Sequence, residues 1–302
     1  MRIVTEIPDR IAQDIGMSRE EMSKRHLISE MEARYYKQLF NRGDAVYSHR
    51  INSVPESGKT KRALILADMH FPHVDWAALD CALDYGHKKG CDTVILNGDV
   101  GDNHSVSYFK KDPQSVNYQR DIDNTVAGIE YIREAFPDAD MYEIEGNHEL
   151  RLRWMLWTKA KALSGLKVLE IPSLYNLDKF NIKYVSVSQQ MEHEIKPFHI
   201  GKLYIVHGHE IRVSYSAVNI PRLYYFKTHV NILVAHHHAT QEFIARKHNF
   251  EHDGAWSMGA LCKLSPEFMP CNNWNHGFAI VVWDNDGNFS VLNKKVIGGR
   301  VV

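Results

Sequence analysis

Hydrophobic and polar residues alternate along most of the chain in blocks that predict strands and helices in turn. From Arg62 onwards, short apolar runs are separated by longer amphipathic stretches. Short runs rich in Val, Ile and Leu are typical of buried strands, and the longer stretches have helical spacing. The predicted strands cover residues 63–67, 93–96, 141–144, 182–187, 203–206 and 232–235, and the predicted helices cover 75–89 and 121–135. This order predicts an α/β fold.

The two ends of the chain have other patterns. Ser18 and Glu21 have the spacing of a capping box, and apolar residues then recur every four positions, which predicts one amphipathic helix over about residues 18–40. From about Gln241 the chain is β-rich. Strands are expected over residues 242–245, 278–283 and 289–292, with a hairpin turn at residues 284–287.

A polar stretch over residues 52–60 predicts a linker. We therefore divide the chain into a helical extension with its linker, residues 1–60, and a main domain, residues 61–302. The helix of the extension either packs on its own domain or makes a homodimer, and the pattern leaves both open.

Composition narrows the class of protein. Of the 302 residues, 44% are hydrophobic and 24% are charged, and the formal net charge is −1. No apolar run reaches the roughly 20 residues that span a membrane, and the start lacks the apolar core of a secretory signal. We expect a cytoplasmic globular protein without a membrane partner. The neutral charge does not indicate a long nucleic-acid track, and the four cysteines, which include no C-x-x-C pair, are expected to be reduced.

The 18 histidines are a high number for this length, and several lie in polar clusters directly after predicted strands. Open α/β sheets place their sites beyond the carboxyl ends of the strands. The clusters are Asp68-Met69-His70, Gly98-Asp99-Val100-Gly101-Asp102, Gly146-Asn147-His148-Glu149, His207-Gly208-His209 and His236-His237-His238.

Side chains of Asp, Asn and His together suit borderline divalent ions such as Mn, Fe, Zn or Ni. In an extended segment, residues i and i+2 point to the same side, so Asp68 and His70 are expected to reach one ion. The same argument applies to His236 and His238, with His237 pointing away. A single cluster would more often be a helix cap or a turn, but five at strand ends predict a metal site.

The order and spacing of these clusters resemble the calcineurin-like metallophosphoesterase superfamily, from about Arg62 to His238. The resemblance implies a four-layer α/β/β/α sandwich, here with an N-terminal helical extension. It also implies two divalent metal ions, with Mn expected first and Fe, Zn or Ni as alternatives. The implied ligands are Asp68, His70, Asp99 and His238 for the first ion, and Asp99, Asn147, His207 and His236 for the second.

Two details of this assignment differ from the family pattern or leave a choice. Ala235 stands where a glycine usually precedes the last His-x-His, a change from one small residue to another. His207 directly follows its strand and is preferred as the ligand, with His209 as the alternative.

The resemblance also implies a mechanism. The two ions polarise the phosphoryl oxygens and share a hydroxide that attacks phosphorus in line with the leaving oxygen. His148 is not a ligand in the family, and it donates a proton to the leaving group or stabilises the charge that develops on phosphorus. Asp102 is expected to orient His148 and raise its pKa, although a carboxylate that caps the loop is the alternative.

The substrate is less constrained. Related protein phosphatases have an arginine after G-D-x-x-D, and Asn103 stands there instead, which counts against a phosphoprotein. Arg151, His104 and Trp274 are candidate substrate-binding residues, each with a structural alternative. The layout is also similar to uncharacterised bacterial and phage metallophosphoesterases, some grouped with repair exonucleases. We expect a phosphodiester of a nucleotide or nucleic acid; the alternatives are a phosphomonoesterase of a small metabolite or nucleotide and a non-catalytic scaffold.

Overall fold

The computed structural model describes residues 16–26, 33, 60–186, 197–213 and 218–302. The chain forms two units, residues 1–51 and 52–302, and each is considered by itself. The expected division at residue 60 stays a prediction. No helix in the described ranges combines the length and the apolar character needed to cross a membrane.

In the first unit, helix α2 (Arg19–His26) begins where the capping box predicts. The Glu21 N–H donates to Oγ of Ser18 (3.2 Å), and the Ser18 N–H donates to Oε2 of Glu21 (2.9 Å). These reciprocal bonds satisfy two donors at the start of the helix. The rest of the helix expected up to about residue 40 lies outside the described residues, apart from Ala33.

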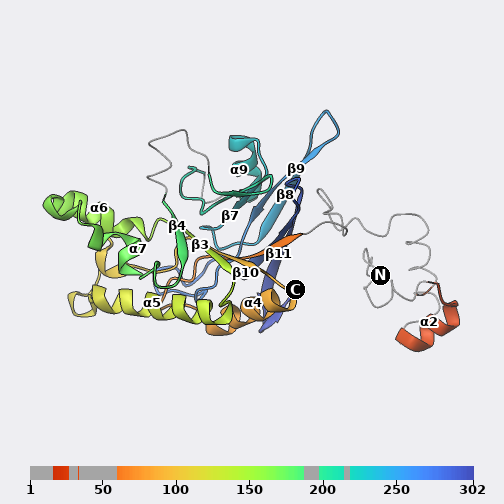
Figure 1. Ribbon diagram of the computed structural model, residues 1–302, viewed down its shortest axis with the longest axis horizontal. Helices are drawn as coiled ribbons and strands as arrows, with labels where there is room; N and C mark the ends of the chain where they lie inside the picture. The colour runs from red at the N-terminus through yellow and green to blue at the C-terminus, as the bar shows by residue number, and fades with distance from the viewer. Residues whose placement is uncertain (1–15, 27–32, 34–59, 187–196, 214–217) are drawn as a thin grey trace. The chain divides into compact units, whose positions relative to one another are not determined.

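The second unit contains two β-sheets, as expected for the predicted α/β sandwich (Figure 1). The seven-stranded sheet has the order β12-β11-β10-β1-β2-β3-β4, and the five-stranded sheet has the order β5-β6-β7-β9-β8. The strands of the larger sheet are β1 (Lys61–Leu66), β2 (Thr93–Asn97), β3 (Asp140–Ile144), β4 (Ile182–Val185), β10 (His276–Trp283), β11 (Phe289–Ile297) and β12 (Arg300–Val301). Those of the smaller sheet are β5 (His199–Ile200), β6 (Leu203–Val206), β7 (Ile232–Val234), β8 (Gln241–Arg246) and β9 (His252–Ser257).

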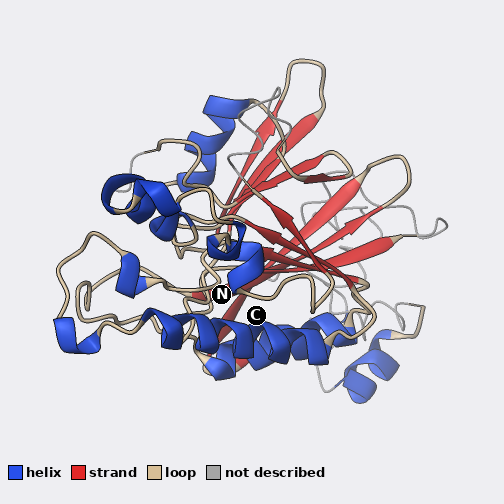
Figure 2. Ribbon diagram, turned by 60° about the vertical axis from the view of Figure 1, so that its left-hand side comes forward, coloured by secondary structure: helices blue, strands red, loops and turns tan. Residues whose placement is uncertain are grey.

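Helices cover the outer faces of the two sheets (Figures 1 and 2). Helix α4 (Trp76–Lys88) packs against β1 and β10, and α9 (Ile220–Thr228) packs against β8 and β9. The apolar stripes of α4 and of α5 (Tyr118–Ala135) join the strand residues of the larger sheet in one core. The remaining helices are α6 (Leu150–Lys159), α7 (Ile171–Leu174) and the 3₁₀ turns η1 (His104–Val106), η2 (Pro113–Ser115), η3 (Lys161–Leu163) and η4 (Lys167–Leu169).

The inner faces of the sheets contact each other. Leu64 and Leu66 of β1 belong to the helix-facing core, while Ala63 and Ile65 on the opposite face are also fully buried. Asn97 at the end of β2 donates through Nδ2 to the Val206 carbonyl of β6 (3.0 Å). Burial on both faces explains why β1 is a continuous apolar run rather than an alternating one.

Strands β1 to β4 are parallel, as are β6 and β7. Their carboxyl ends therefore lie at one edge of each sheet, and the Asn97–Val206 bond joins the β2 and β6 ends across the two sheets. The predicted strands and both predicted helices are confirmed, as is the turn after β10. Strand β9 and helix α9 were not predicted, and β11 extends to Ile297 rather than residue 292.

Candidate metal centre

The structure brings the loops after five parallel strands together at one place. Asp68 and His70 follow β1, Asp99 follows β2, Asn147 follows β3, His207 follows β6, and His236 and His238 follow β7. Backbone contacts join these loops: the His236 N–H donates to Oδ2 of Asp68 (3.1 Å), and the His148 N–H donates to Oδ1 of Asp99 (2.9 Å).

The backbone at this edge is left-handed rather than extended. Residues with positive φ angles include Asp68 (53°), His70 (49°), Asp99 (51°), His236 (66°) and His238 (55°). The expectation that Asp68 and His70, or His236 and His238, share one side of an extended segment is therefore wrong. Each pair converges because the chain turns sharply at both residues. A left-handed conformation costs a non-glycine residue roughly 1–3 kcal/mol, so the surrounding contacts must hold these loops in place.

Four donor atoms form a first cluster around His70. Its Nε2 lies 3.4 Å from Nε2 of His238, 3.9 Å from Oδ1 of Asp68 and 3.8 Å from Oδ2 of Asp99. His238 Nε2 is also 3.2 Å from Asp68 Oδ1. Ligands about 2.1 Å from a metal ion are separated from each other by roughly 3.0–3.4 Å, so these atoms have the spacing of a coordination shell slightly expanded.

A second cluster forms around His207, which is fully buried. Its Nε2 lies 3.3 Å from Oδ2 of Asp99 and 3.2 Å from Oδ1 of Asn147. His236 belongs to this group, since its ring offers a donor atom within 4.8 Å of those of Asp99 and His207. Nδ1 of His207 is 2.8 Å from the Asn97 carbonyl, and a proton on Nδ1 would leave the Nε2 lone pair for an ion.

Oδ2 of Asp99 faces both clusters, which is the position required of a bridging carboxylate. The histidines around Asp99 compensate for the buried negative charge of the carboxylates. Burial opposes protonation, but Asp99 and other acidic neighbours outweigh it and raise the pKa of His207 to about 10. Burial is likewise outweighed at His70, where Asp102 and other neighbours raise the pKa to about 9. The site thus favours cations, and two divalent ions fit its donor set.

This geometry favours His207 over His209 as the proposed metal ligand. Nε2 of His207 faces both Asp99 and Asn147, whereas Nδ1 of His209 lies 3.6 Å from Oε2 of Glu210, and the two histidine rings are 5.5 Å apart. His237 points away from the clusters, because its Nε2 lies 2.9 Å from the Tyr224 hydroxyl.

His148 and Asp102 lie beside the first cluster. Nδ1 of His148 is 3.1 Å from Oδ1 of Asp102 and 2.9 Å from its carbonyl, and Nε2 is 3.7 Å from Oδ2 of Asp99. Oδ1 of Asp102 is also 3.4 Å from Nδ1 of His70, so one carboxylate orients both rings. Burial lowers the pKa of His148 overall. The hydrogen bond to Asp102 acts to raise this pKa, as expected, but burial outweighs it.

The three candidate substrate residues occupy different settings. Arg151 is in the site: its Nη1 donates to the Asp102 carbonyl (2.6 Å), and its Nη2 is 2.8 Å from Nε2 of His148. Trp274 is half-buried, with its ring 4.2 Å from that of His238. The side chain of His104 is exposed, and the carbonyl of this residue accepts a hydrogen bond from Lys111.

Glu149 has a positioning role that sequence reasoning missed. Its buried carboxylate accepts hydrogen bonds from the N–H groups of Asp99, Val100, Gly101 and Gly146, at 2.9–3.2 Å. Burial raises the pKa of this carboxyl to about 7, while the backbone donors oppose the increase. The acidic residue after Asn-His was visible in the sequence, but no pattern showed that it ties the β2 and β3 loops together.

Cys262 was also missed. Its buried thiol has a sulfur within 4.8 Å of donor atoms of His70 and His238, and burial raises its pKa to about 11. No local motif marks it, because it lies far along the chain from the other clusters.

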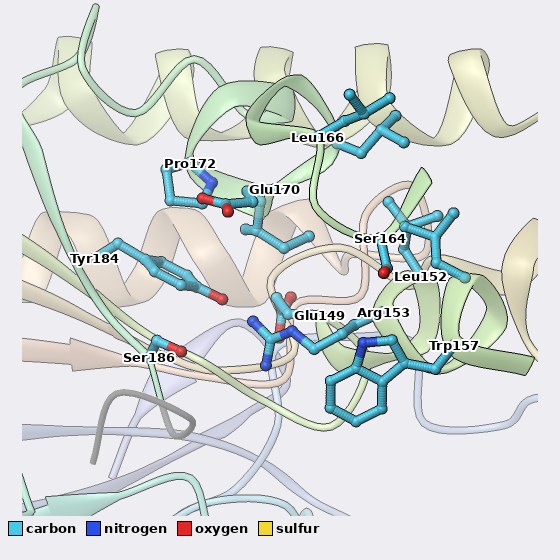
Figure 3. Close-up of a pocket in the computed structure, with 13 residues that line it drawn as sticks. Glu149, Leu152, Arg153, Trp157, Ser164, Leu166, Glu170, Pro172, Tyr184 and Ser186 are labelled. Carbon is cyan, nitrogen blue, oxygen red and sulfur yellow. The ribbon is translucent and has the colours of Figure 1, made fainter. Parts of the chain in front are cut away.

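A cavity of about 230 Å³ lies on the other side of Glu149, between α6, α7 and β4 (Figure 3). Apolar residues of α6 and of the following turns form part of the wall, and the polar part consists of Glu149, Arg153, Ser164, Glu170, Tyr184 and Ser186. Three of these side chains, Arg153, Tyr184 and Ser186, donate to the buried carboxylate of Glu145, at 2.7–3.4 Å. Arg153 is therefore held by an ion pair with Glu145, whereas Arg151 contacts Asp102 and His148 in the metal centre.

Residues 61–262 match the family described as Calcineurin-like phosphoesterase, and the chain belongs to this family. No curated protein matches the sequence.

Solved structures with a similar fold include three that each cover most of the second unit. A single mutant of Vps29 from Entamoeba histolytica has 13% identity and a TM-score of 0.39, covering 80% of this chain and 96% of its own. A dimetal phosphatase from Danio rerio has 12% identity and a TM-score of 0.41, covering 80% and 98%. Yfce, a phosphoesterase from E. coli, has 12% identity and a TM-score of 0.34, covering 76% and 98%.

Proposed function

We propose that this protein is a dinuclear metal-dependent hydrolase of phosphodiesters in nucleotides or nucleic acids. The observation that carries the proposal is the position of Asp99 Oδ2, which faces both donor clusters and lies 3.7 Å from Nε2 of His148. When bound, two divalent ions would polarise the phosphoryl group and activate water for in-line attack. The nitrogen and oxygen donor set suits Mn, Fe, Zn or Ni, and Mn is the ion we expect from the family resemblance.

His148 and Arg151 would both act on the bound substrate. In the structure Nδ1 of His148 faces Asp102 and Nε2 is 2.8 Å from Nη2 of Arg151, which is a donor. Nε2 therefore accepts in this arrangement. An incoming phosphate would draw the Arg151 guanidinium towards its oxygens and free Nε2 of His148. Once free, Nε2 would take up a proton from solvent and give it to the leaving oxygen, with Asp102 stabilising the transient imidazolium.

The charges around the site favour a diester over a monoester. A phosphodiester carries one negative charge, whereas a monoester near neutral pH carries close to two. Arg151, the cation beside His148, is already in contact with Asp102. Asn103, at the place of the arginine in related protein phosphatases, is buried and donates to the Tyr175 hydroxyl (2.6 Å). A dianion would therefore have little additional positive charge to bind.

The proposal is tested with purified protein, Mn and two simple substrates, bis-p-nitrophenyl phosphate and p-nitrophenyl phosphate. We expect a higher kcat/KM for the diester. A large preference for the monoester would contradict the diester assignment and favour a phosphomonoesterase. Failure to bind Mn and to hydrolyse either ester would favour a scaffold.

A further inference from the structure

Two aromatic side chains project from the loop that follows the Asp99–Asp102 cluster. Tyr108 is 82% exposed and Phe109 is 52% exposed. Their rings stack on each other, with centroids 4.4 Å apart and planes at 29°. Burial of a large aromatic ring stabilises a fold, but these two neighbouring rings remain largely in water. Packing within the fold therefore does not explain why aromatic residues stand at these positions.

Hydrogen bonds fix the backbone of the loop that carries these rings. Nζ of Lys111 donates to the carbonyls of His104 and Ser105, at 2.8 and 3.1 Å, and also contacts Ser107. The Ser105 N–H donates to Oδ2 of Asp121 on α5 (3.1 Å). A surface whose backbone is already fixed loses less conformational entropy when a ligand binds to it.

One side chain connects these rings to the metal centre. The Arg151 guanidinium lies 5.9 Å from the Phe109 ring centroid, and its nitrogens contact Asp102 and Nε2 of His148. This is the distance range of a cation–π contact. A ligand stacked on the rings would therefore be separated from His148, the proposed proton donor, only by the Arg151 side chain.

We propose that Tyr108 and Phe109 form an aromatic platform on which a nucleobase of the substrate stacks while Arg151 contacts the phosphate of the same ligand. This rests on the proposed function, because it assumes that the scissile phosphate lies beside His148. A nucleotide carries its base one sugar away from its phosphate, which matches the short separation between Arg151 and Phe109. Every base has a π face, so the platform selects nucleotide over simple diesters without selecting a sequence.

Two diesters with the same leaving group test the platform: the p-nitrophenyl ester of thymidine 5′-phosphate and methyl p-nitrophenyl phosphate. Any stacking of the nitrophenyl ring is common to both, so the ratio of their kcat/KM values isolates the base. We expect the wild-type chain to favour the nucleotide ester. Tyr108→Ala should lower this ratio roughly 5- to 150-fold, the range that base–aromatic stacking supplies, and Tyr108→Trp should keep it.

Phe250 provides the matched control. It is 72% exposed and also lies near an arginine, with Arg246 5.0 Å from its ring centroid, but it belongs to the β8–β9 turn. Phe250→Ala should leave the ratio unchanged. If the wild type does not favour the nucleotide ester, or if Tyr108→Ala and Phe109→Ala both keep the wild-type ratio, the platform is wrong while the diesterase proposal can still hold.

A binding measurement separates the two proposals if neither ester is hydrolysed. Fluorescence anisotropy of a fluorescein-labelled short oligothymidylate is measured in the presence of EDTA with the full chain. Loss of affinity in Tyr108→Ala but not in Phe250→Ala would support the platform even though the proposed reaction had failed. No binding by the wild type, or equal binding by Tyr108→Ala, would overturn the platform.

Discussion

Two carboxylates in the metal centre each face two partners. Oδ2 of Asp99 lies between the His70 and His207 clusters, and Oδ1 of Asp102 lies between the rings of His70 and His148. Because each carboxylate contacts two partners, it fixes the relative positions of groups that come from different loops. It also separates the roles: Asp99 belongs to both donor sets, whereas His148 is outside them and points its Nε2 towards Arg151.

A substitution at His148 should separate binding from turnover. His148→Asn keeps all seven proposed ligands, so metal content should be unchanged. Turnover of a diester with a poor alkoxide leaving group should fall roughly 10²- to 10⁴-fold, the usual contribution of general acid–base catalysis. The p-nitrophenyl esters should lose less, because a good leaving group needs less protonation. Steady-state kinetics with metal analysis checks this, and full activity on the alkoxide ester would rule out His148 as the proton donor.

Single residues differ in how far the sequence predicts them. The meeting of the five polar clusters was predictable because residues after buried parallel strands lie at one edge of the sheet, whereas the choice of the seven proposed ligands came from the family resemblance. Glu149 and Cys262 were not, since the first acts through backbone N–H groups and the second is brought in by the tertiary fold alone. The effect of Asp102 on the pKa of His148 was predicted in the right direction, but the net lowering was not, because depth of burial is not visible in a motif.

The loops after β2 and β3 lie so close that one of their glycines has no room for a side chain. A Cβ atom on Gly146 would lie 2.3 Å from the Asp99 nitrogen and 2.7 Å from Oε2 of Glu149. Such an atom must displace the β2 loop and with it the bridging carboxylate. The closeness of these loops is maintained by the Glu149 carboxylate, which binds N–H groups from both.

Gly146→Ala should therefore lower both the stability and the metal affinity of the protein. Overpacking of this kind typically costs about 1–3 kcal/mol of unfolding free energy. Gly165→Ala is the matched control, because a Cβ there meets nothing within 4 Å. Thermal unfolding with and without Mn measures both effects. A Gly146→Ala variant that keeps the stability gain of the wild type on adding Mn would contradict the proposed coupling between the two loops.

Most elements of the second unit were predictable because β1 and β2 are buried on both faces and contain continuous apolar runs, while β3 is marked by Met141 and Ile144 before the polar cluster. Strand β9 was not, since its sequence, HDGAWS, has neither an apolar run nor a regular alternation. Helix α9 is short, and its start is marked only by the Asn219 cap and Pro221. The left-handed turns at the ligands were missed because they occur at non-glycine residues, where only the assembled site holds them.

The sequence left open whether the N-terminal helix packs on its own domain or makes a homodimer, and a homodimer through this helix stays a prediction. A chain beginning at residue 52 lacks that unit but retains all twelve strands of the described part. If the helix makes a homodimer, light scattering gives a dimer for the full chain and a monomer for the shortened one. Metal binding by the shortened chain shows that it is folded. The same number of chains per particle in both would exclude dimerisation through the N-terminal helix.

The central claim is that two ions share Asp99, and anomalous scattering from crystals grown with Mn tests it most directly. The account predicts two peaks about 3.5–4 Å apart, both in contact with Asp99, and the loss or weakening of both in Asp99→Asn. Asp286→Asn, which changes an exposed carboxylate in the β10–β11 turn, should keep both peaks. A single ion in the wild type, or two fully occupied ions in Asp99→Asn, would contradict the account.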